Sequence, residues 1–248
     1  SETVYQSGLT GAAQPATQRA MSQLSGPMSQ DFHTRICLAA SAAGLLPMGA
    51  LHPHRVAARG LDHGTLVLLG TGSGFWTAFQ TSPEFRDGAP DPVDRWSRRI
   101  VDTLAERFGA TALYPFGGPP YLPFIDWAEK SGRAHPSPTG MLVHNRVGLM
   151  ISYRGALHFS DCFDIPDADQ PAPCKTCDSL PCTTACPVGA LSATAPYDVA
   201  ACHAYLDTAA GRDCLDNGCA ARRACPVSAG AARSPAQSAL HMKAFHPK

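Results

Sequence analysis

The sequence predicts an α/β or α+β sandwich followed by a smaller cysteine-rich module. Residues 1–165 alternate short apolar runs with segments of helical periodicity. Asp161–Pro173 then gathers three prolines and four aspartates without apolar periodicity, as a linker would. A chain of 248 residues is long enough for one substantial core and an appended module. We therefore expect one domain over residues 1–165 and a second over residues 166–248.

The first predicted elements are a helix and a buried strand. Ser29 or Asp31 can cap the helix, which carries Ile36 within its apolar side and which Gly44 is placed to end. The apolar run Leu66–Leu69 is long enough only for a buried strand.

The clearest helix pattern in the chain follows Asp91. This residue is the expected cap, Pro92 stands in the first turn, and Gly109 is placed to stop the helix. Its apolar stripe consists of Trp96, Ile100, Leu104 and Phe108. Such a stripe needs a sheet to cover, and Ala112–Tyr114 is predicted to be one of its strands.

The remaining elements of the first domain are a helix and a strand pair. Phe124–Lys130 has the pattern of a helix that Gly132 ends. Val147–Tyr153 and Ala156–Phe159 are predicted to be paired strands that turn at Arg154 and Gly155.

Composition excludes several classes of function. Twenty basic residues balance twenty acidic ones and form no basic block, which argues against a nucleic-acid partner. No run approaches the ~20 apolar residues that cross a bilayer, so no membrane contact is expected. Residues 1–26 lack a basic segment followed by an apolar one, and we therefore expect a cytoplasmic protein.

The ten cysteines are distributed very unevenly. Cys37 lies on an apolar helix face and is expected to pack there, and Cys162 in the linker is expected to be a free thiol. The other eight crowd between Cys174 and Cys225. In a chain of this length without a secretion signal, such a group more often ligates metal than forms disulfides.

The spacing of these eight cysteines is that of a bacterial ferredoxin with one lengthened gap. The run from Cys174 ends in C-x3-C-P at Cys186, and Cys225 begins a second cysteine–proline pair. In proteins with two clusters, the cysteine before proline ligates the other cluster. We therefore predict two [4Fe-4S] clusters, the first held by Cys174, Cys177, Cys182 and Cys225, the second by Cys186, Cys202, Cys214 and Cys219.

The second set is the less regular one, and two alternatives stay open. Asp198 can cap a helix that carries Cys202, whereas Cys214 and Cys219 lie in a loop rich in Gly and Asp. Four thiolates also suit a structural zinc ion. The other alternative is one intact cubane cluster beside one degraded site.

The arrangement resembles the family of epoxyqueuosine reductases and reductive dehalogenases, and the first domain resembles the cobalamin-trafficking protein of methylmalonic aciduria type C. The resemblance rests on the cysteine set, on Cys202 in the segment CHAYL, and on residues 128–132 and 138–157, and it spans roughly residues 60–226. It implies a nitroreductase-like fold that holds a corrinoid such as cobalamin, with the two clusters relaying single electrons to cobalt.

The chain also departs from that family. Epoxyqueuosine reductases carry a catalytic aspartate shortly before the glycine that matches Gly132, and residues 116–121 (FGGPPY) occupy that region here. The last cysteine motif lacks an internal cysteine, for which Cys214 is the expected substitute. Neither a helical-repeat tail nor a twin-arginine leader is present in this sequence. These departures argue against queuosine chemistry and against membrane-linked respiratory dehalogenation.

Four residues are candidates for a site in the first domain. Phe116 belongs to an aromatic loop of the kind that walls flat cofactors. Tyr121 and His144 are candidate proton donors and cofactor contacts, since both have a titratable proton and lie where the family lines its cavity. Tyr153, in the matching segment, is the fourth candidate cofactor contact.

Three functional hypotheses follow from these patterns. The first is a reductase whose clusters feed a bound corrinoid and a small-molecule substrate. The second is a ferredoxin-like electron carrier that docks a redox partner such as a ferredoxin, a flavodoxin or a reductase. The third is a cobalamin-handling protein without redox chemistry.

Two further patterns are weaker. The glycines of residues 70–74 come one position too early for a dinucleotide loop, so a tight structural turn is preferred. His52, His54 and His63 can be a metal face or exposed loop residues, and the second interpretation is favoured.

Overall fold

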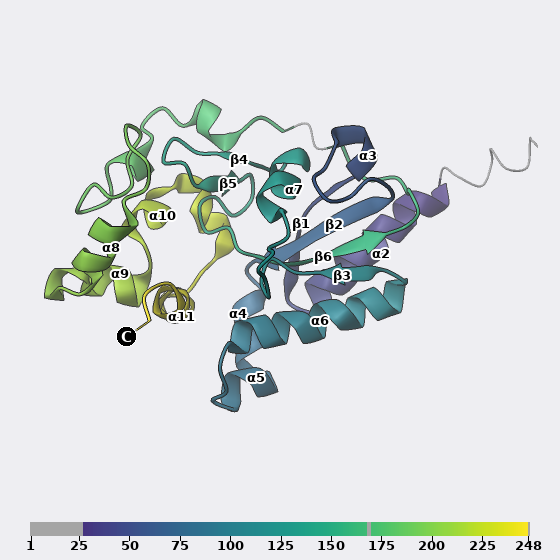
Figure 1. Ribbon diagram of the computed structural model, residues 1–248, viewed down its shortest axis with the longest axis horizontal. Coiled ribbons are helices and arrows are strands. Elements are labelled where there is room, and N and C mark those ends of the chain that lie inside the picture. Colours follow the sequence, from purple (N-terminus) through teal and green to yellow (C-terminus); the bar gives the residue numbers. More distant parts are fainter. Residues whose placement is uncertain (1–26, 168–169, 248) are drawn as a thin grey trace, which may run out of the picture.

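A four-stranded antiparallel sheet forms the centre of the first lobe in the computed structural model, which describes residues 27–167 and 170–247 (Figure 1). The strands lie in the order β1 (Leu45–Leu51), β2 (Thr65–Thr71), β6 (Tyr153–Phe159) and β3 (Thr111–Leu113). This open antiparallel sheet with helices agrees with the α+β alternative of the predicted fold class. Residues 1–26, on which the expected absence of a secretion signal rests, lie outside the described residues.

One face of the sheet packs against α2 (Pro27–Ala42) and α6 (Pro92–Phe108). Because side chains alternate along a strand, Val67 and Leu69 of β2 point to this face, where they are fully buried with Trp96. The long helix α6 lies along the sheet in Figure 1. Its apolar stripe covers this face, as its sequence pattern predicts.

The other face of the sheet carries a second apolar cluster. Leu66 and Leu68 point there and pack with Trp127 of α7 (Phe124–Lys130). Ala231, from the C-terminal part of the chain, belongs to the same cluster. The sheet is therefore covered on both faces, which explains why every residue of β2 is buried.

Several predicted element ends agree with the structure. The helix α6 follows Asp91 and ends at Gly109, whose φ of +70° only glycine adopts readily. Asp91 occupies the cap position without a side-chain capping bond. The helix α7 has the predicted bounds, and Gly132 follows it with a φ of +67°.

Two predicted features are wrong. The helix α2 begins at Pro27, so neither Ser29 nor Asp31 occupies its capping position. Arg154 and Gly155 do not form a turn, because the single strand β6 runs through them. A Cβ atom on Gly155 would stand 2.9 Å from the Val101 Cγ2 atom, so this glycine serves the close approach of α6 and not a hairpin.

The cysteine-rich lobe lies beside the sheet and contains short helices and turns (Figure 1). The linker segment 161–167 is bonded to the first lobe, for example through the Asp161 carbonyl, which accepts from the Thr65 hydroxyl at 3.0 Å. No helix in the described residues is long and apolar enough to cross a bilayer. The remaining elements are α3 (Pro53–Val56), α4 (Phe75–Gln80), α5 (Pro83–Arg86), β4 (Ala134–Pro136), β5 (Leu142–His144), η1 (Pro173–Thr176), η2 (Pro181–Thr183), α8 (Val199–Leu206), η3 (Ala209–Gly211), α9 (Arg212–Asn217), α10 (Ala220–Ala224), η4 (Pro226–Ala231) and α11 (Pro235–Phe245).

Candidate metal centre

Four cysteines of the first set surround one cavity of about 200 Å³. Cys174 lies in η1, Cys177 directly after it, and Cys182 in η2, so three thiols come from two tight turns. Cys225, which directly follows α10, supplies the fourth. The chain thus brings together, around one space, thiols separated by some fifty residues.

Apolar side chains line one side of the first cavity. Val143 and Leu149, both 1 % exposed, pack against Cys182 and Cys225. These side chains come from the first lobe, so the cavity lies at the contact between the lobes. An apolar surround excludes water and lowers the local dielectric around any group bound there.

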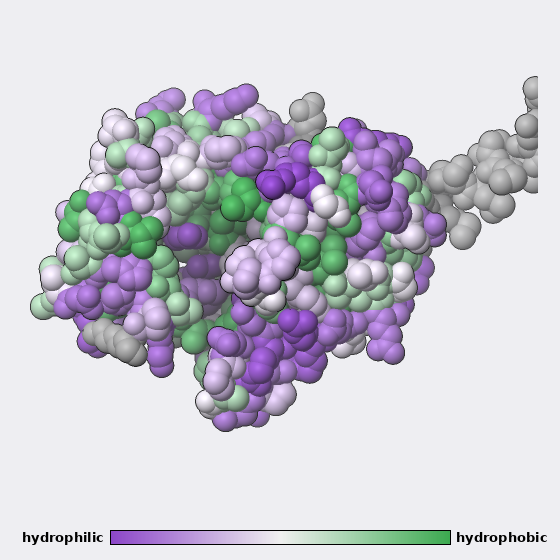
Figure 2. All heavy atoms as spheres, in the orientation of Figure 1, coloured by the Kyte–Doolittle hydropathy of each residue, from purple (hydrophilic) through white to green (hydrophobic). Residues whose placement is uncertain are grey.

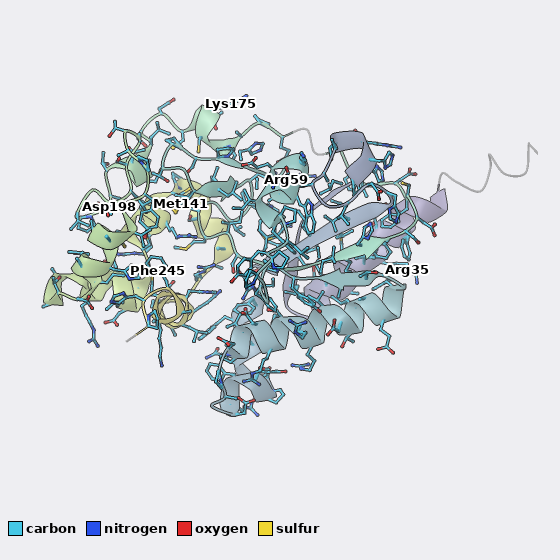
Figure 3. All side chains as sticks on the ribbon, viewed as in Figure 1. Arg35, Arg59, Met141, Lys175, Asp198 and Phe245 are labelled. Carbon is cyan, nitrogen blue, oxygen red and sulfur yellow. The ribbon has the colours of Figure 1, made fainter. Side chains whose placement is uncertain are left out.

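The second set of thiols lines another cavity. Cys202 lies on α8, Cys214 on α9 and Cys219 just before α10, and Cys186 joins them. The predicted cap of α8 is confirmed, since the Asp198 carboxylate accepts a hydrogen bond from the Ala201 amide at 2.8 Å (Figure 3).

The second cavity is much smaller than the first. Its volume is about 20 Å³, which is space for about one water molecule. Its donor set suits a cubane cluster, but its four side chains must move apart to admit one. This difference keeps the alternative of a single intact cluster open.

The cysteines before proline cross between the two sets. Cys186, which ends the first run, lines the second cavity, and Cys225 lines the first. The Cys182 thiol has a raised pKa because it is buried and because Cys225 and Cys177 lie near it. Burial likewise raises the pKa of Cys202, with Cys219 and Cys186 adding to the effect and the Tyr197 hydroxyl opposing it. A bound metal would have to displace protons from these thiols.

All ten cysteines are free thiols, so no disulfide competes with metal binding. Within the described residues, no group of three or more His, Cys, Asp or Glu side chains is arranged to hold a metal ion. The four thiols of the first set line a cavity of about 200 Å³, and four thiolates are the donor set of both a zinc ion and a [4Fe-4S] cluster.

The two candidate proton donors occupy contrasting environments. Tyr121 is 65 % exposed, whereas His144 is 1 % exposed. The His144 Nε2 atom bonds the Met48 carbonyl at 3.1 Å, and its Nδ1 atom accepts from the Arg146 amide at 3.1 Å. These bonds require the neutral tautomer with the proton on Nε2. Burial lowers the pKa of His144 to about 4, so at neutral pH the ring is uncharged and its one N–H proton lies in the bond to the Met48 carbonyl.

Phe116 and Tyr153, the other two candidate cofactor contacts, also have different surroundings. The Phe116 ring faces the guanidinium groups of Arg98 and Arg154, each 5.5 Å from its centre. Tyr153 lies in β6 with its ring 6.3 Å from that of Phe124, and its buried hydroxyl has no hydrogen-bond partner in the described structure. A catalytic or cofactor role for the four residues stays a prediction.

Two weaker patterns have structural explanations. A Cβ atom on Gly70 would stand 3.2 Å from the Met48 Cγ atom and closer still to its sulfur, so this glycine serves close packing between β1 and β2. The His52 Nε2 atom bonds the Phe163 carbonyl at 2.9 Å, and His63 pairs with Asp62 at 2.6 Å.

A cleft that the sequence did not predict lies between the lobes. One cavity of about 240 Å³ and another of about 600 Å³ adjoin there, since Ser152 and His241 line both. The smaller one reaches Cys202 and Cys219 of the second set. The basic residues of the smaller cavity, Arg222 and Arg233, belong to no motif, so the sequence did not indicate it.

No protein-family model matches the chain, and no curated protein matches it. The resemblance to epoxyqueuosine reductases and reductive dehalogenases therefore stays a prediction that rests on the residues quoted for it.

Proposed function

We propose that this chain is an iron–sulfur oxidoreductase that carries two [4Fe-4S] clusters and delivers single electrons to a centre between its lobes. The observation that supports this proposal most is the division of eight thiols into two groups of four, each around its own cavity. The crossing of Cys186 and Cys225 is the pattern of two-cluster ferredoxins.

The side chains around the thiols would serve that chemistry in definite ways. A [4Fe-4S] cluster supplies reversible one-electron transfer at a potential that its surroundings set. Val143 and Leu149 would keep water from the first cavity. The Tyr197 hydroxyl, whose effect on the pKa of Cys202 opposes that of burial, would stabilise negative charge on that sulfur.

The position of the cleft favours a reductase over a simple electron carrier. A carrier needs only an exposed edge near its clusters, whereas here a cavity of about 240 Å³ reaches Cys202 and Cys219 from between the lobes. A corrinoid as the acceptor rests on the family resemblance, and the adjoining cavities are compatible with a bound cofactor.

The deciding experiment is iron and acid-labile sulfide analysis of anaerobically purified full-length chain, with electron paramagnetic resonance after reduction. Two [4Fe-4S] clusters correspond to about eight irons per chain and one intact cluster to about four. Zinc in place of iron, or a colourless iron-free chain, would refute the redox function.

A second experiment tests the corrinoid. Titrating cob(II)alamin into the anaerobic protein should shift its absorption and paramagnetic resonance spectra if the first lobe or the cleft holds it. Unchanged spectra, on a sample with full iron content, would leave the ferredoxin-like carrier as the better description.

A further inference from the structure

The cleft cavity beside the second set of thiols has an unusual charge distribution. Arg222 on α10 and Arg233, which precedes α11, both line it together with His241. No carboxylate is among its described lining residues. Figure 2 shows this face hollowed between the two lobes, with polar and apolar surface in the hollow.

Backbone carbonyls of the first lobe hold both arginines in place. The Arg222 Nη1 atom donates to the Leu149 carbonyl at 2.7 Å, and the Arg233 Nη2 atom donates to the Met150 carbonyl at 2.7 Å. A guanidinium has five N–H donors, so each side chain retains several. Neither arginine has an acidic partner among the described residues, whereas Arg223, the neighbour of Arg222, pairs with Asp213.

Two buried nitrogen atoms at this cavity have no hydrogen-bond partner in the described structure. They are the Nε atom of Arg233 and the Nε2 atom of His241. Burial, together with Arg222 and Arg154, lowers the pKa of Arg233 to about 10. Among the described residues, Arg154 pairs with Asp94 at 3.0 Å, whereas neither Arg222 nor Arg233 has an acidic partner.

Buried cations without a counter-charge are costly, and leaving their donors unbonded adds to the cost. Proteins retain such groups where an anionic ligand completes them. Most of the remaining lining is apolar and includes Met141 and Phe245, which Figure 3 labels, while Ser152, Tyr197 and Ser238 add hydroxyl groups. The cavity therefore matches a molecule with a charged end and an apolar body.

We propose that this cavity binds a small molecule whose carboxylate or phosphate group is held by Arg222, Arg233 and His241 and whose apolar body lies against Met141 and Phe245. Anion binding itself needs no iron. That the ligand is the electron acceptor rests on the proposed function, because Cys202 and Cys219 line the same cavity.

Isothermal titration calorimetry on the anaerobically purified full chain tests this site. Phenyl phosphate is the probe for both features, inorganic phosphate for the charge alone, and benzyl alcohol for the apolar part. We expect phenyl phosphate to bind at least about tenfold more tightly than inorganic phosphate, since a buried ring adds apolar contact. Benzyl alcohol should not bind measurably.

Two variants and one control locate the binding. Arg233→Gln and Arg222→Gln should each weaken phenyl phosphate binding at least about tenfold, the loss of a charge-assisted bond. Arg212→Gln removes an equal charge from the surface of the same lobe and should bind as the wild type does. The Arg212 side chain is 76 % exposed, pairs with Asp216 and is not among the residues that line the cavity.

Three results would overturn the proposal: no saturable binding of phenyl phosphate, equal binding of benzyl alcohol, or equal weakening by Arg212→Gln. Circular dichroism shows whether each variant folds, and Arg222→Gln decides if Arg233→Gln does not. Iron analysis of the same samples separates this inference from the proposed function. A chain with full iron that binds no anion refutes only the anion site, and an iron-free chain that binds phenyl phosphate refutes only its redox role.

Discussion

Gly148 and Ser228 pack backbone against backbone at the contact between the two lobes. A Cβ atom on Gly148 would collide with the Ser228 nitrogen and stand 2.7 Å from the Val227 carbonyl carbon, and the φ of Gly148 is +56°. Ser228 also accepts a hydrogen bond from the Leu149 amide at 3.1 Å. The cysteine–proline turn at Cys225 is thus set against the first lobe by a contact that only glycine permits.

Gly148→Ala should therefore separate the lobes or destabilise the protein. Gly140→Ala is its matched control, because Gly140 has a φ of +78° and nothing within 4 Å of the added atom. Both variants carry the backbone strain, and only Gly148→Ala adds the collision, which we expect to cost a further ~1–3 kcal/mol. Urea unfolding measures the difference. Equal free energies of unfolding for the two variants would contradict this account.

The crossing of the cysteine–proline pairs predicts the effect of single serine substitutions. Cys225→Ser should leave three thiols at the first site, and Cys186→Ser should leave three at the second. Each should lose about half of the iron of a two-cluster chain. Cys162→Ser, which changes an exposed cysteine of the linker, should retain all of it. Iron content and paramagnetic resonance of the reduced variants check this, and equal iron loss in Cys162→Ser would count against the assignment.

Glu84 and Arg99 should make the fold sensitive to acid. The Arg99 Nε and Nη2 atoms donate to the Glu84 carboxylate at 2.6 and 2.9 Å and lower its pKa to about 2. An unfolded glutamate titrates near pH 4.5, so the pair's contribution is complete above that pH and is lost as pH falls toward 2. Because Arg99 is partly exposed, we expect only ~1–2 kcal/mol.

Glu84→Gln should remove that contribution and flatten the stability profile between these two pH values. Glu129→Gln changes an exposed carboxylate and serves as the control. Thermal unfolding as a function of pH is the measurement. A wild-type profile in Glu84→Gln would show that the pair contributes nothing.

His144 should remain neutral at physiological pH. Its pKa is lowered to about 4 by burial, so the unfolded chain binds this proton more readily than the folded chain does. The burial of neutral His144 therefore does not reduce the free energy of unfolding above pH ~6.5. As pH falls toward 4, protonation of the unfolded chain lowers that free energy by up to ~3 kcal/mol. Imidazole NMR should show the Nε2–H tautomer without titration between pH ~5 and ~8. A ring that titrates near neutrality would contradict this account and would favour the predicted role of His144 as a proton donor.

The hydroxyl of Tyr153 should be dispensable for stability. It is buried without a partner, so Tyr153→Phe should leave stability unchanged or raise it by ~1 kcal/mol. Tyr205→Phe is the contrasting control, because the Tyr205 hydroxyl donates to the Ala210 carbonyl at 2.8 Å and its loss should cost ~1 kcal/mol. Chemical unfolding of both variants tests this. A marked loss in Tyr153→Phe purified with a bound cofactor would instead favour the predicted cofactor contact.

Local chemistry made some elements predictable and others not. The bounds of α6 and α7 could be predicted because Gly109 and Gly132 end these helices through positive φ angles. The strand β1 could not, since Pro47 and Gly49 interrupt it as they would a loop. It forms because an edge strand tolerates proline and because β2 supplies its hydrogen bonds.

The sequence by itself determined which cysteines could act together, because thiol spacing and the two cysteine–proline turns are local properties of the chain. It also determined the main helices, whose apolar stripes and terminal glycines are local too. Only the tertiary structure decided the cleft, where Arg222 and Arg233 donate to carbonyls of the first lobe and His241 lines the same cavity. A sequence pattern does not show that a charge is buried. Whether an arginine lowers stability or binds a ligand depends on the groups that pack around it.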